Sequence, residues 1–204
     1  EKLVAWAKTY EVGVVSDLAY GALGYRGYEN PSFLSTPGAK DVGIEFYTFS
    51  KTFNMAGWRL AFAAGNDQMI EALNLIQDHL FVGIFPALQE AGIAALLDPK
   101  SEEAVAQLNA TYDSRRDAFV QAAAKIGWQA FPSRGSFYAW MPVPEGYTSE
   151  SFADLLLEKV HVAVAPGKGF GPAGDAYVRI GLLVEPERLV EAVDRIANLH
   201  LFNN

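Results

Sequence analysis

The residues with the clearest chemical potential lie in one segment, Thr48 to Arg59, which reads Thr-Phe-Ser-Lys-Thr-Phe-Asn-Met-Ala-Gly-Trp-Arg. Lys51 follows an expected buried strand, and its apolar neighbours favour the neutral amine that a Schiff base with an aldehyde requires. Arg59 offers a planar guanidinium suited to phosphate, and Thr48 and Ser50 add hydroxyl groups. These groups would suit a phosphorylated aldehyde, although the spacing alone fits a surface Lys–Arg pair beside an apolar strand at least as well.

The same segment resembles the cofactor-attachment motif of class I/II pyridoxal-phosphate-dependent aminotransferases, with Ser-Lys, a small residue and Gly-x-Arg. The match covers residues 48–61, and threonine at position 48, where the family more often has serine or glycine, keeps the hydroxyl. The resemblance implies that Lys51 binds pyridoxal 5'-phosphate as a Schiff base, and that Thr48, Ser50 and Arg59 hold its phosphate. It also implies that the freed Lys51 amine acts as general base at the substrate α-carbon.

Two residues upstream fit the same family. Asp17 and Tyr20 stand in Asp-Leu-Ala-Tyr, directly after an apolar run. The pair alone is also compatible with a strand-end aspartate and a packed tyrosine. The resemblance implies that Asp17 pairs with the pyridine nitrogen, which makes the ring an electron sink, and that Tyr20 bonds the phenolic oxygen.

A third element lies near the end of the chain. Arg179 stands in Tyr-Val-Arg-Ile-Gly-Leu, a predicted strand in which an arginine is more often a surface residue or part of an ion pair. The surrounding residues, and Ala-Pro-Gly-Lys-Gly-Phe-Gly at 165–171, resemble the part of these enzymes that binds the substrate carboxylate. An arginine suits this role because it grips a carboxylate with two parallel hydrogen bonds.

Hydrophobic patterning predicts the elements that must position these residues. Strands are expected at residues 12–16, 45–49, 59–64, 129–131, 137–141, 161–165 and 177–182. Helices are expected at residues 69–80, 86–97, 151–159 and 187–201, with a further one that Ser101 would cap and that would run to about residue 126. Between them, residues 21–40 are rich in glycine and proline and predict a long loop.

Strands that alternate with connecting segments predict an α/β fold. The resemblance makes this part of a fold type I large domain, a mixed and mostly parallel sheet with helices, followed by a smaller α+β domain. We expect the large-domain part at residues 1–92 and the small domain at residues 93–204. Since the family is about twice as long, the chain is expected to be the C-terminal half of a longer protein and to be inactive alone.

Composition excludes several classes of protein. The chain has 204 residues with 16 Lys and Arg against 24 Asp and Glu, a net charge of -8, which argues against a nucleic-acid partner. The absence of cysteine excludes disulfides, zinc–cysteine sites and a thiolate nucleophile. The longest run without Asp, Glu, Lys or Arg, residues 79–89, is far shorter than the about 20 residues of a membrane helix. We therefore expect a cytoplasmic protein without a membrane partner or metal.

The resemblance implies a homodimeric aminotransferase that moves an amino group between an L-amino acid and a 2-oxo acid. The sequence of residues 53–59 is similar to that of the aspartate-aminotransferase-like group. The expected substrates are a neutral or apolar amino acid and glutamate. Two alternatives use the same residues. One is a pyridoxal-phosphate carbon–sulfur β-lyase, and the other is the aminotransferase-like effector domain of a transcription regulator.

Overall fold

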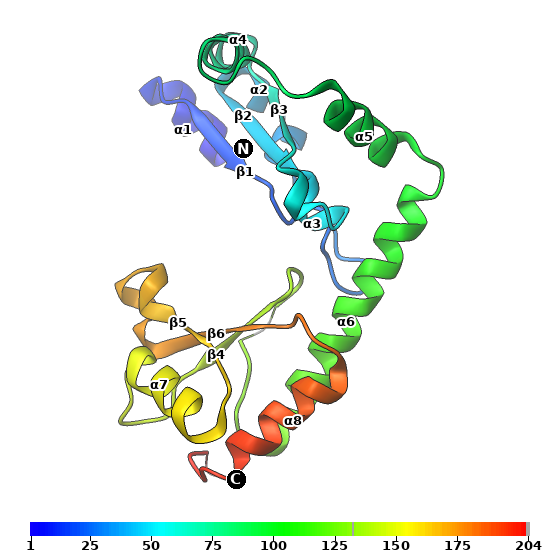
Figure 1. Ribbon diagram of the computed structural model, residues 1–204. Helices are drawn as coiled ribbons and strands as arrows, with labels where there is room; N and C mark the ends of the chain where they lie inside the picture. Colours follow the sequence, from blue (N-terminus) through cyan, green and yellow to red (C-terminus); the bar gives the residue numbers. More distant parts are fainter. Residues whose placement is uncertain (132, 203–204) are drawn as a thin grey trace. The chain divides into compact units, whose positions relative to one another are not determined.

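The computed structural model describes residues 1–131 and 133–202 (Figure 1). The chain divides into two compact units, Glu1–Leu108 and Asn109–Asn204, and helix α6 (Ser101–Lys125) contains the boundary. The division between functional domains expected after residue 92 stays a prediction, because compactness alone assigns no function to either part. None of the helices within the described ranges is long and apolar enough to cross a membrane.

The first unit is built on a three-stranded mixed sheet in the order β1-β2-β3. Strand β1 (Val14–Asp17) runs parallel to β2 (Gly43–Thr48), and β3 (Ala61–Gly65) pairs antiparallel with β2. The helices of this unit are α1 (Lys2–Tyr10), α2 (Ala39–Val42), α3 (Phe49–Thr52), α4 (Asp67–Ile76) and α5 (Pro86–Leu97). Shorter turns are η1 (Phe33–Ser35), η2 (Ala56–Trp58) and the π-helix η3 (Gln77–Phe81).

The long segment between β1 and β2 is tied to the sheet by a buried carboxylate. Glu45 on β2 is 7% exposed and accepts hydrogen bonds from Ser16 Oγ at 2.9 Å, Ser32 Oγ at 2.6 Å and the Phe33 amide at 2.7 Å. A carboxylate has enough lone pairs for three donors, so its burial costs little here. The loop expected at residues 21–40 is confirmed as largely irregular, and Glu45 fixes its path.

The second unit packs three helices against a three-stranded antiparallel sheet in the order β4-β6-β5. The strands are β4 (Tyr138–Pro142), β5 (Ala165–Pro166) and β6 (Tyr177–Gly181), and the helices are the end of α6, α7 (Ser149–Val160) and α8 (Pro186–Ala197), with turns η4 (Gly167–Phe170) and η5 (Pro172–Ala176). One sheet face joins the helices in a core whose fully buried side chains include Phe119, Trp128, Met141, Phe152, Leu156, Val178, Val193 and Ile196.

Several sequence expectations for local structure are wrong. The closing helix, expected to reach residue 201, ends at Ala197. Residues 129–131 form no strand, although the Phe131 amide donates to the Trp140 carbonyl at 2.9 Å. Residues 161–164 are not a strand either, because His161 takes the left-handed conformation that ends α7, and β5 is only two residues long. Ser101 does not cap α6 but is its first residue, and its hydroxyl donates to the Ala95 carbonyl at 2.6 Å.

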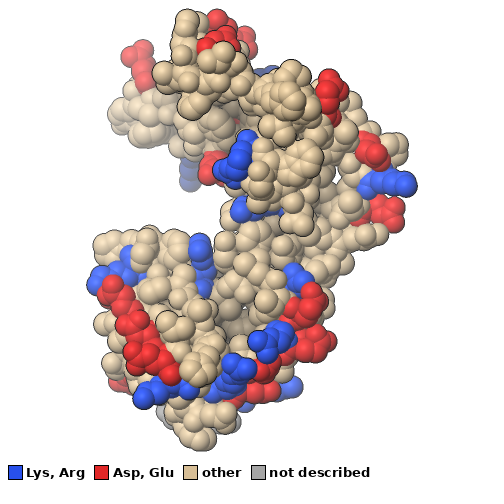
Figure 2. Space-filling model, in the orientation of Figure 1, with Lys and Arg blue, Asp and Glu red and all other residues tan. Residues whose placement is uncertain are grey.

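The expected fold class is confirmed as α/β with a mixed sheet and helices, followed by a second layered unit (Figure 1). On the face drawn in Figure 2, Lys and Arg side chains lie interspersed with Asp and Glu and form no continuous basic surface. That distribution fits the acidic balance of the sequence.

Candidate active site

Six of the seven predicted site residues lie at one end of the first sheet. Because β1 and β2 are parallel, Asp17 at the end of β1 and Thr48 at the end of β2 share the carboxyl edge. The antiparallel β3 begins at the same edge, since Ala61 pairs with Thr48, and this brings Arg59 there too. The carboxyl edge of a sheet in α/β proteins is the usual place for a ligand.

Lys51 is held in the short helix α3, which follows β2 directly. Thr48 is the N-cap of this helix, because its side chain accepts a hydrogen bond from the Ser50 amide at 3.2 Å. Phe49 anchors the turn in the core with 3% of its surface exposed, and its amide donates to the Leu60 carbonyl at 3.2 Å. Lys51 itself is half-buried, and its side chain projects from this helical turn.

Tyr20 lies beside that amine. Lys51 Nζ is 5.9 Å from the centroid of the Tyr20 ring. The turn that carries Tyr20 is fixed by Asn30, whose amide nitrogen lies within hydrogen-bonding distance of three backbone carbonyls, those of Tyr20 (3.1 Å), Gly21 (3.2 Å) and Leu23 (3.3 Å). The turn also needs glycine at position 24, because a Cβ there would lie 1.6 Å from the Tyr28 carbonyl oxygen.

Asp17 presents an exposed carboxylate at the same edge. Within residues 1–131 and 133–202, it accepts no hydrogen bond and forms no ion pair. The next residue, Leu18, continues the ladder by donating its amide to the Phe46 carbonyl at 2.9 Å, so the backbone around Asp17 is fixed. An ordered backbone with an uncommitted carboxylate suits a side chain that is to pair with a cationic group of a ligand.

Two hydroxyls and a guanidinium supply the groups that would bind a phosphate. Thr48 Oγ1 and Ser50 Oγ lie 2.9 Å apart. Arg59 has φ 53° and ψ 43°, a left-handed conformation that turns the chain from η2 into β3. Its Nη1 donates to the Ala56 carbonyl at 2.9 Å, which leaves most of its five N–H donors for another partner.

The chemistry of these side chains fits pyridoxal phosphate group by group. The amine of Lys51 could react with the cofactor's aldehyde, and the carboxylate of Asp17 could pair with its pyridinium nitrogen. The hydroxyl of Tyr20 could bond its phenolic oxygen. The Thr48 and Ser50 hydroxyls and the Arg59 guanidinium could bind its phosphate. A cavity of about 570 Å³ in this unit is lined by Arg59, Phe62 and residues of α4, but not by Lys51 or Asp17. The reactive groups therefore lie at the strand ends rather than in that cavity.

Arg179 belongs to the second unit and lies on β6, opposite Trp140 of β4. Its Cζ atom is 4.1 Å from the centroid of the Tyr138 ring and 4.3 Å from that of Phe170. The sequence analysis did not include these two aromatic residues among the site residues. Tyr138 and Trp140 stand two positions apart on one expected strand, and Tyr177 and Arg179 on another. This spacing could have placed those four side chains on one face of the sheet, but it says nothing of Phe170.

Comparison with known proteins supports this interpretation. The family model "Aminotransferase class I and II" matches residues 1–196. The chain is 57% identical over 202 residues to L-glutamine–4-(methylsulfanyl)-2-oxobutanoate aminotransferase of Bacillus subtilis, covering 99% of this chain and 50% of that protein. It is 45% identical over 196 residues to LL-diaminopimelate aminotransferase of Moorella thermoacetica, covering 96% of this chain and 50% of the relative.

Solved structures agree with the sequence relatives. An aminotransferase from Staphylococcus aureus superposes with a TM-score of 0.93 at 39% identity, covering 99% of this chain and 53% of the other. The apo form of BacF from Bacillus subtilis gives a TM-score of 0.93 at 44% identity, covering 100% of this chain and 52% of the BacF chain. The chain thus spans about half the length of the curated relatives that it matches. By the family match and by these folds, the chain belongs to the class I and II aminotransferases of fold type I.

Proposed function

We propose that this chain carries the cofactor-binding end of a pyridoxal-phosphate-dependent aminotransferase, which moves an amino group between an L-amino acid and a 2-oxo acid. The observation that carries the proposal is the grouping of Asp17, Tyr20, Lys51 and the Thr48–Ser50 hydroxyl pair at one sheet edge. The names of the relatives favour transamination over a β-lyase or a regulator domain.

In this proposal each side chain has a defined role, and Lys51 has two. Pyridoxal phosphate, when bound, supplies an aldehyde for the substrate amine and a ring that accepts the electron pair of the α-carbon. Lys51 Nζ holds the cofactor and, once released by the incoming substrate amine, takes the proton from the substrate α-carbon. The carboxylate of Asp17 keeps the ring nitrogen protonated.

The remaining residues bind and orient. The Tyr20 hydroxyl bonds the phenolic oxygen, and Thr48, Ser50 and Arg59 hold the phosphate through hydroxyl and guanidinium donors. Arg179 binds the substrate α-carboxylate with two parallel N–H donors. Because both substrates carry an α-carboxylate, one arginine serves both halves of the reaction.

The substrate class follows from the relatives only as a proposal. Identity of 57% to the enzyme named for glutamine and 4-(methylsulfanyl)-2-oxobutanoate supports an amide side chain on the donor and a thioether 2-oxo acid as acceptor. Identity of 45% to an LL-diaminopimelate aminotransferase makes diaminopimelate the second candidate. We further propose that the enzyme works as a cytoplasmic homodimer. Light scattering of the purified full chain measures its mass and so tests for the dimer.

Borohydride reduction of the full chain with pyridoxal phosphate tests the central proposal. Reduction converts a Schiff base into a stable pyridoxyl adduct, so we expect the mass of one adduct per chain, mapped to the peptide that contains Lys51. The Lys51→Arg variant keeps the charge but should form no adduct there. An adduct on another lysine, or none on the wild-type chain, would contradict the assignment.

Product analysis then separates the reactions. With glutamine and 4-(methylsulfanyl)-2-oxobutanoate we expect methionine, formed only when both substrates are present. Release of ammonia and pyruvate from a cysteine conjugate without any 2-oxo acid would indicate the β-lyase instead. Turnover of diaminopimelate but not of glutamine would favour the second substrate class.

A further inference from the structure

The second sheet has one face in the core and one face that surrounds Arg179 with aromatic rings. Buried residues on the core face are Ala139, Met141, Val178 and Ile180. Side chains of the alternate positions, which lie on the other face because strand residues alternate, are Tyr138, Trp140, Tyr177 and Arg179. We call this second group the aromatic face.

On the aromatic face, the guanidinium of Arg179 contacts rings rather than carboxylates. Its Cζ atom lies 4.1 Å from the Tyr138 centroid and 4.3 Å from the Phe170 centroid. In the part of the chain that the structure describes, no acidic side chain pairs with Arg179. Rings that cover the π-face of a guanidinium leave its in-plane N–H donors for a carboxylate, and they also remove water from around the charge.

Phe170 reaches this face from the segment of residues 167–176, not from a strand. Its ring is 54% exposed and also meets Trp140 edge-on, with centroids 5.8 Å apart. The segment is folded tightly on itself, because a Cβ on Gly167 would lie 2.2 Å from the Gly174 carbonyl oxygen. The position of an exposed ring therefore depends on how this segment is held.

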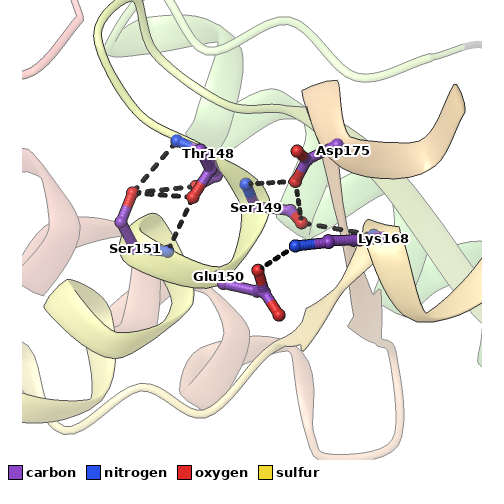
Figure 3. A network of polar contacts seen from close by, with 6 residues as sticks. All are labelled: Thr148, Ser149, Glu150, Ser151, Lys168 and Asp175. Carbon is purple, nitrogen blue, oxygen red and sulfur yellow. Dashed lines mark hydrogen bonds and ion pairs between the residues drawn. The ribbon is translucent and has the colours of Figure 1, made fainter. Parts of the chain in front are cut away.

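A buried hydroxyl holds both ends of the segment (Figure 3). Ser149, at the start of α7, is 0% exposed. It donates its hydroxyl at 2.8 Å and its amide at 3.2 Å to Oδ1 of Asp175, and its Oγ accepts the Lys168 amide at 3.2 Å. The two bonds from Ser149 and the nearby Lys168 ammonium lower the pKa of Asp175 below its ordinary value, as expected for a carboxylate held by donors.

We propose that Ser149 and Asp175 are positioning residues for the carboxylate site, because they fix the segment that places Phe170 on Arg179. The inference rests on the proposed function in one respect: Arg179 is taken as the group that binds the substrate carboxylate. Neither residue touches the carboxylate in this proposal. They act through the ring of Phe170.

The first test compares two substitutions of Asp175 in the full chain with its cofactor bound. Asn keeps an oxygen that accepts both bonds from Ser149, whereas Ala removes it. We expect Asp175→Ala to raise the KM for the amino acid and for the 2-oxo acid by about fivefold to tenfold, the range for loss of one desolvated cation–π contact. kcat should stay within about twofold, and Asp175→Asn should behave like the wild type.

The second test asks whether the effect passes through Phe170. Phe170→Leu keeps an apolar side chain but removes the ring, and should raise both KM values as Asp175→Ala does. In the double variant the two effects should not add, since both remove the same contact. Glu150→Gln is the matched control, because it breaks only the exposed Lys168–Glu150 ion pair of 2.6 Å and should leave both KM values unchanged.

A direct binding measurement separates this inference from the proposed function. Propanoate carries a carboxylate but no amine, and its dissociation constant can be measured by titration calorimetry. Asp175→Ala and Phe170→Leu should raise this constant, and Asp175→Asn and Glu150→Gln should leave it unchanged, in the same order as the KM values. If that order appears in a chain that does not transaminate, the proposed function fails and the positioning role stands. If the chain transaminates but Asp175→Ala matches the wild type, or Asp175→Asn is impaired equally, the positioning role is overturned.

Discussion

The carboxylate of Glu45 accepts a hydrogen bond from the Ser32 hydroxyl, with 2.6 Å between the oxygens. This bond ties the strand that leads to Lys51 to the long loop that follows Tyr20. Two further donors, Ser16 Oγ and the Phe33 amide, converge on the same side chain. Lys51 and the neighbouring Tyr20 thus stand on segments that one buried carboxylate joins. In the part of the chain that the structure describes, no hydrogen bond or ion pair joins Glu45 to either residue, so its effect on the site is through the backbone.

We expect Glu45→Ala to lower the free energy of unfolding by about 2–4 kcal/mol, because three half-buried donors lose a charged acceptor. Urea unfolding of the full chain measures this change. Glu29→Ala is the control, since Glu29 is an exposed carboxylate of the same loop. Equal stability of the two variants would show that Glu45 does not hold the loop.

Cofactor affinity should depend on the hydroxyl pair next to Lys51. Thr48→Val keeps the shape of the side chain but removes the hydroxyl, which lies 2.9 Å from Ser50 Oγ. Losing one hydrogen bond to a charged phosphate should raise the dissociation constant of pyridoxal phosphate by about tenfold or more. The measurement is a spectroscopic titration of the cofactor into apoprotein, with inorganic phosphate as a competitor.

Thr9→Val is the matched control for this substitution, because the Thr9 hydroxyl only donates to the Ala5 carbonyl on the surface of α1. It should leave cofactor affinity unchanged. The Thr48 hydroxyl also accepts the Ser50 amide, so melting temperatures are needed beside the titrations. An unchanged affinity in Thr48→Val and in Ser50→Ala together would rule out the phosphate role of these hydroxyls.

The sequence predicted which side chains lie together at the sheet edge better than it predicted the surroundings of those side chains. The motif around Lys51 and the Asp17–Tyr20 pair are short, local patterns, so they could be read without knowing which strands pair. Helix α5 was also predicted with its observed ends, because Pro86 begins it and Asp98-Pro99 stops it. The family and the fold class followed from these patterns and are confirmed.

What the sequence missed depends on contacts between distant residues. The aromatic face joins β4, β6 and the segment that carries Phe170, and no local pattern reports that Ser149 reaches Asp175. The strand expected at residues 161–165, of which only Ala165 lies in β5, failed for a different reason: its valines and alanines suit a strand, but His161 ends α7 in a left-handed conformation. Local propensity was overridden by how the chain leaves the helix.

The stability of the second unit should respond to acid through Asp175. Its pKa is lowered in the folded protein, chiefly by the Ser149 hydroxyl and then by the Ser149 amide. The folded state therefore favours the carboxylate, so its stabilising contribution is complete above the ordinary pKa of 3.8 and is lost as the pH falls through the lower folded value. Asp175→Asn cannot lose a proton and should not show this dependence.

Unfolding free energies of the wild type and Asp175→Asn should accordingly differ most near neutral pH and converge in strong acid. The measurement is a series of urea unfolding curves from pH 7 to pH values below 3.8. Because the group is solvent-accessible, the difference should be small and should shrink in high salt. A difference that is constant over this range would mean that Asp175 does not act through its charge.

A polypeptide of residues 1–204 produced alone should self-associate and lack transaminase activity. Leu80, Phe81 and Val82 are 70%, 68% and 88% exposed in one continuous stretch, and β3 pairs only with β2 among the strands of the described residues. Clustered exposed apolar side chains and an open strand edge both favour association. We expect binding of a hydrophobic dye and oligomers in light scattering, both reduced in the double variant Leu80→Ser/Val82→Ser. A monodisperse monomer that unfolds cooperatively and binds no dye would contradict this prediction, since the exposed stretch would then need no partner surface.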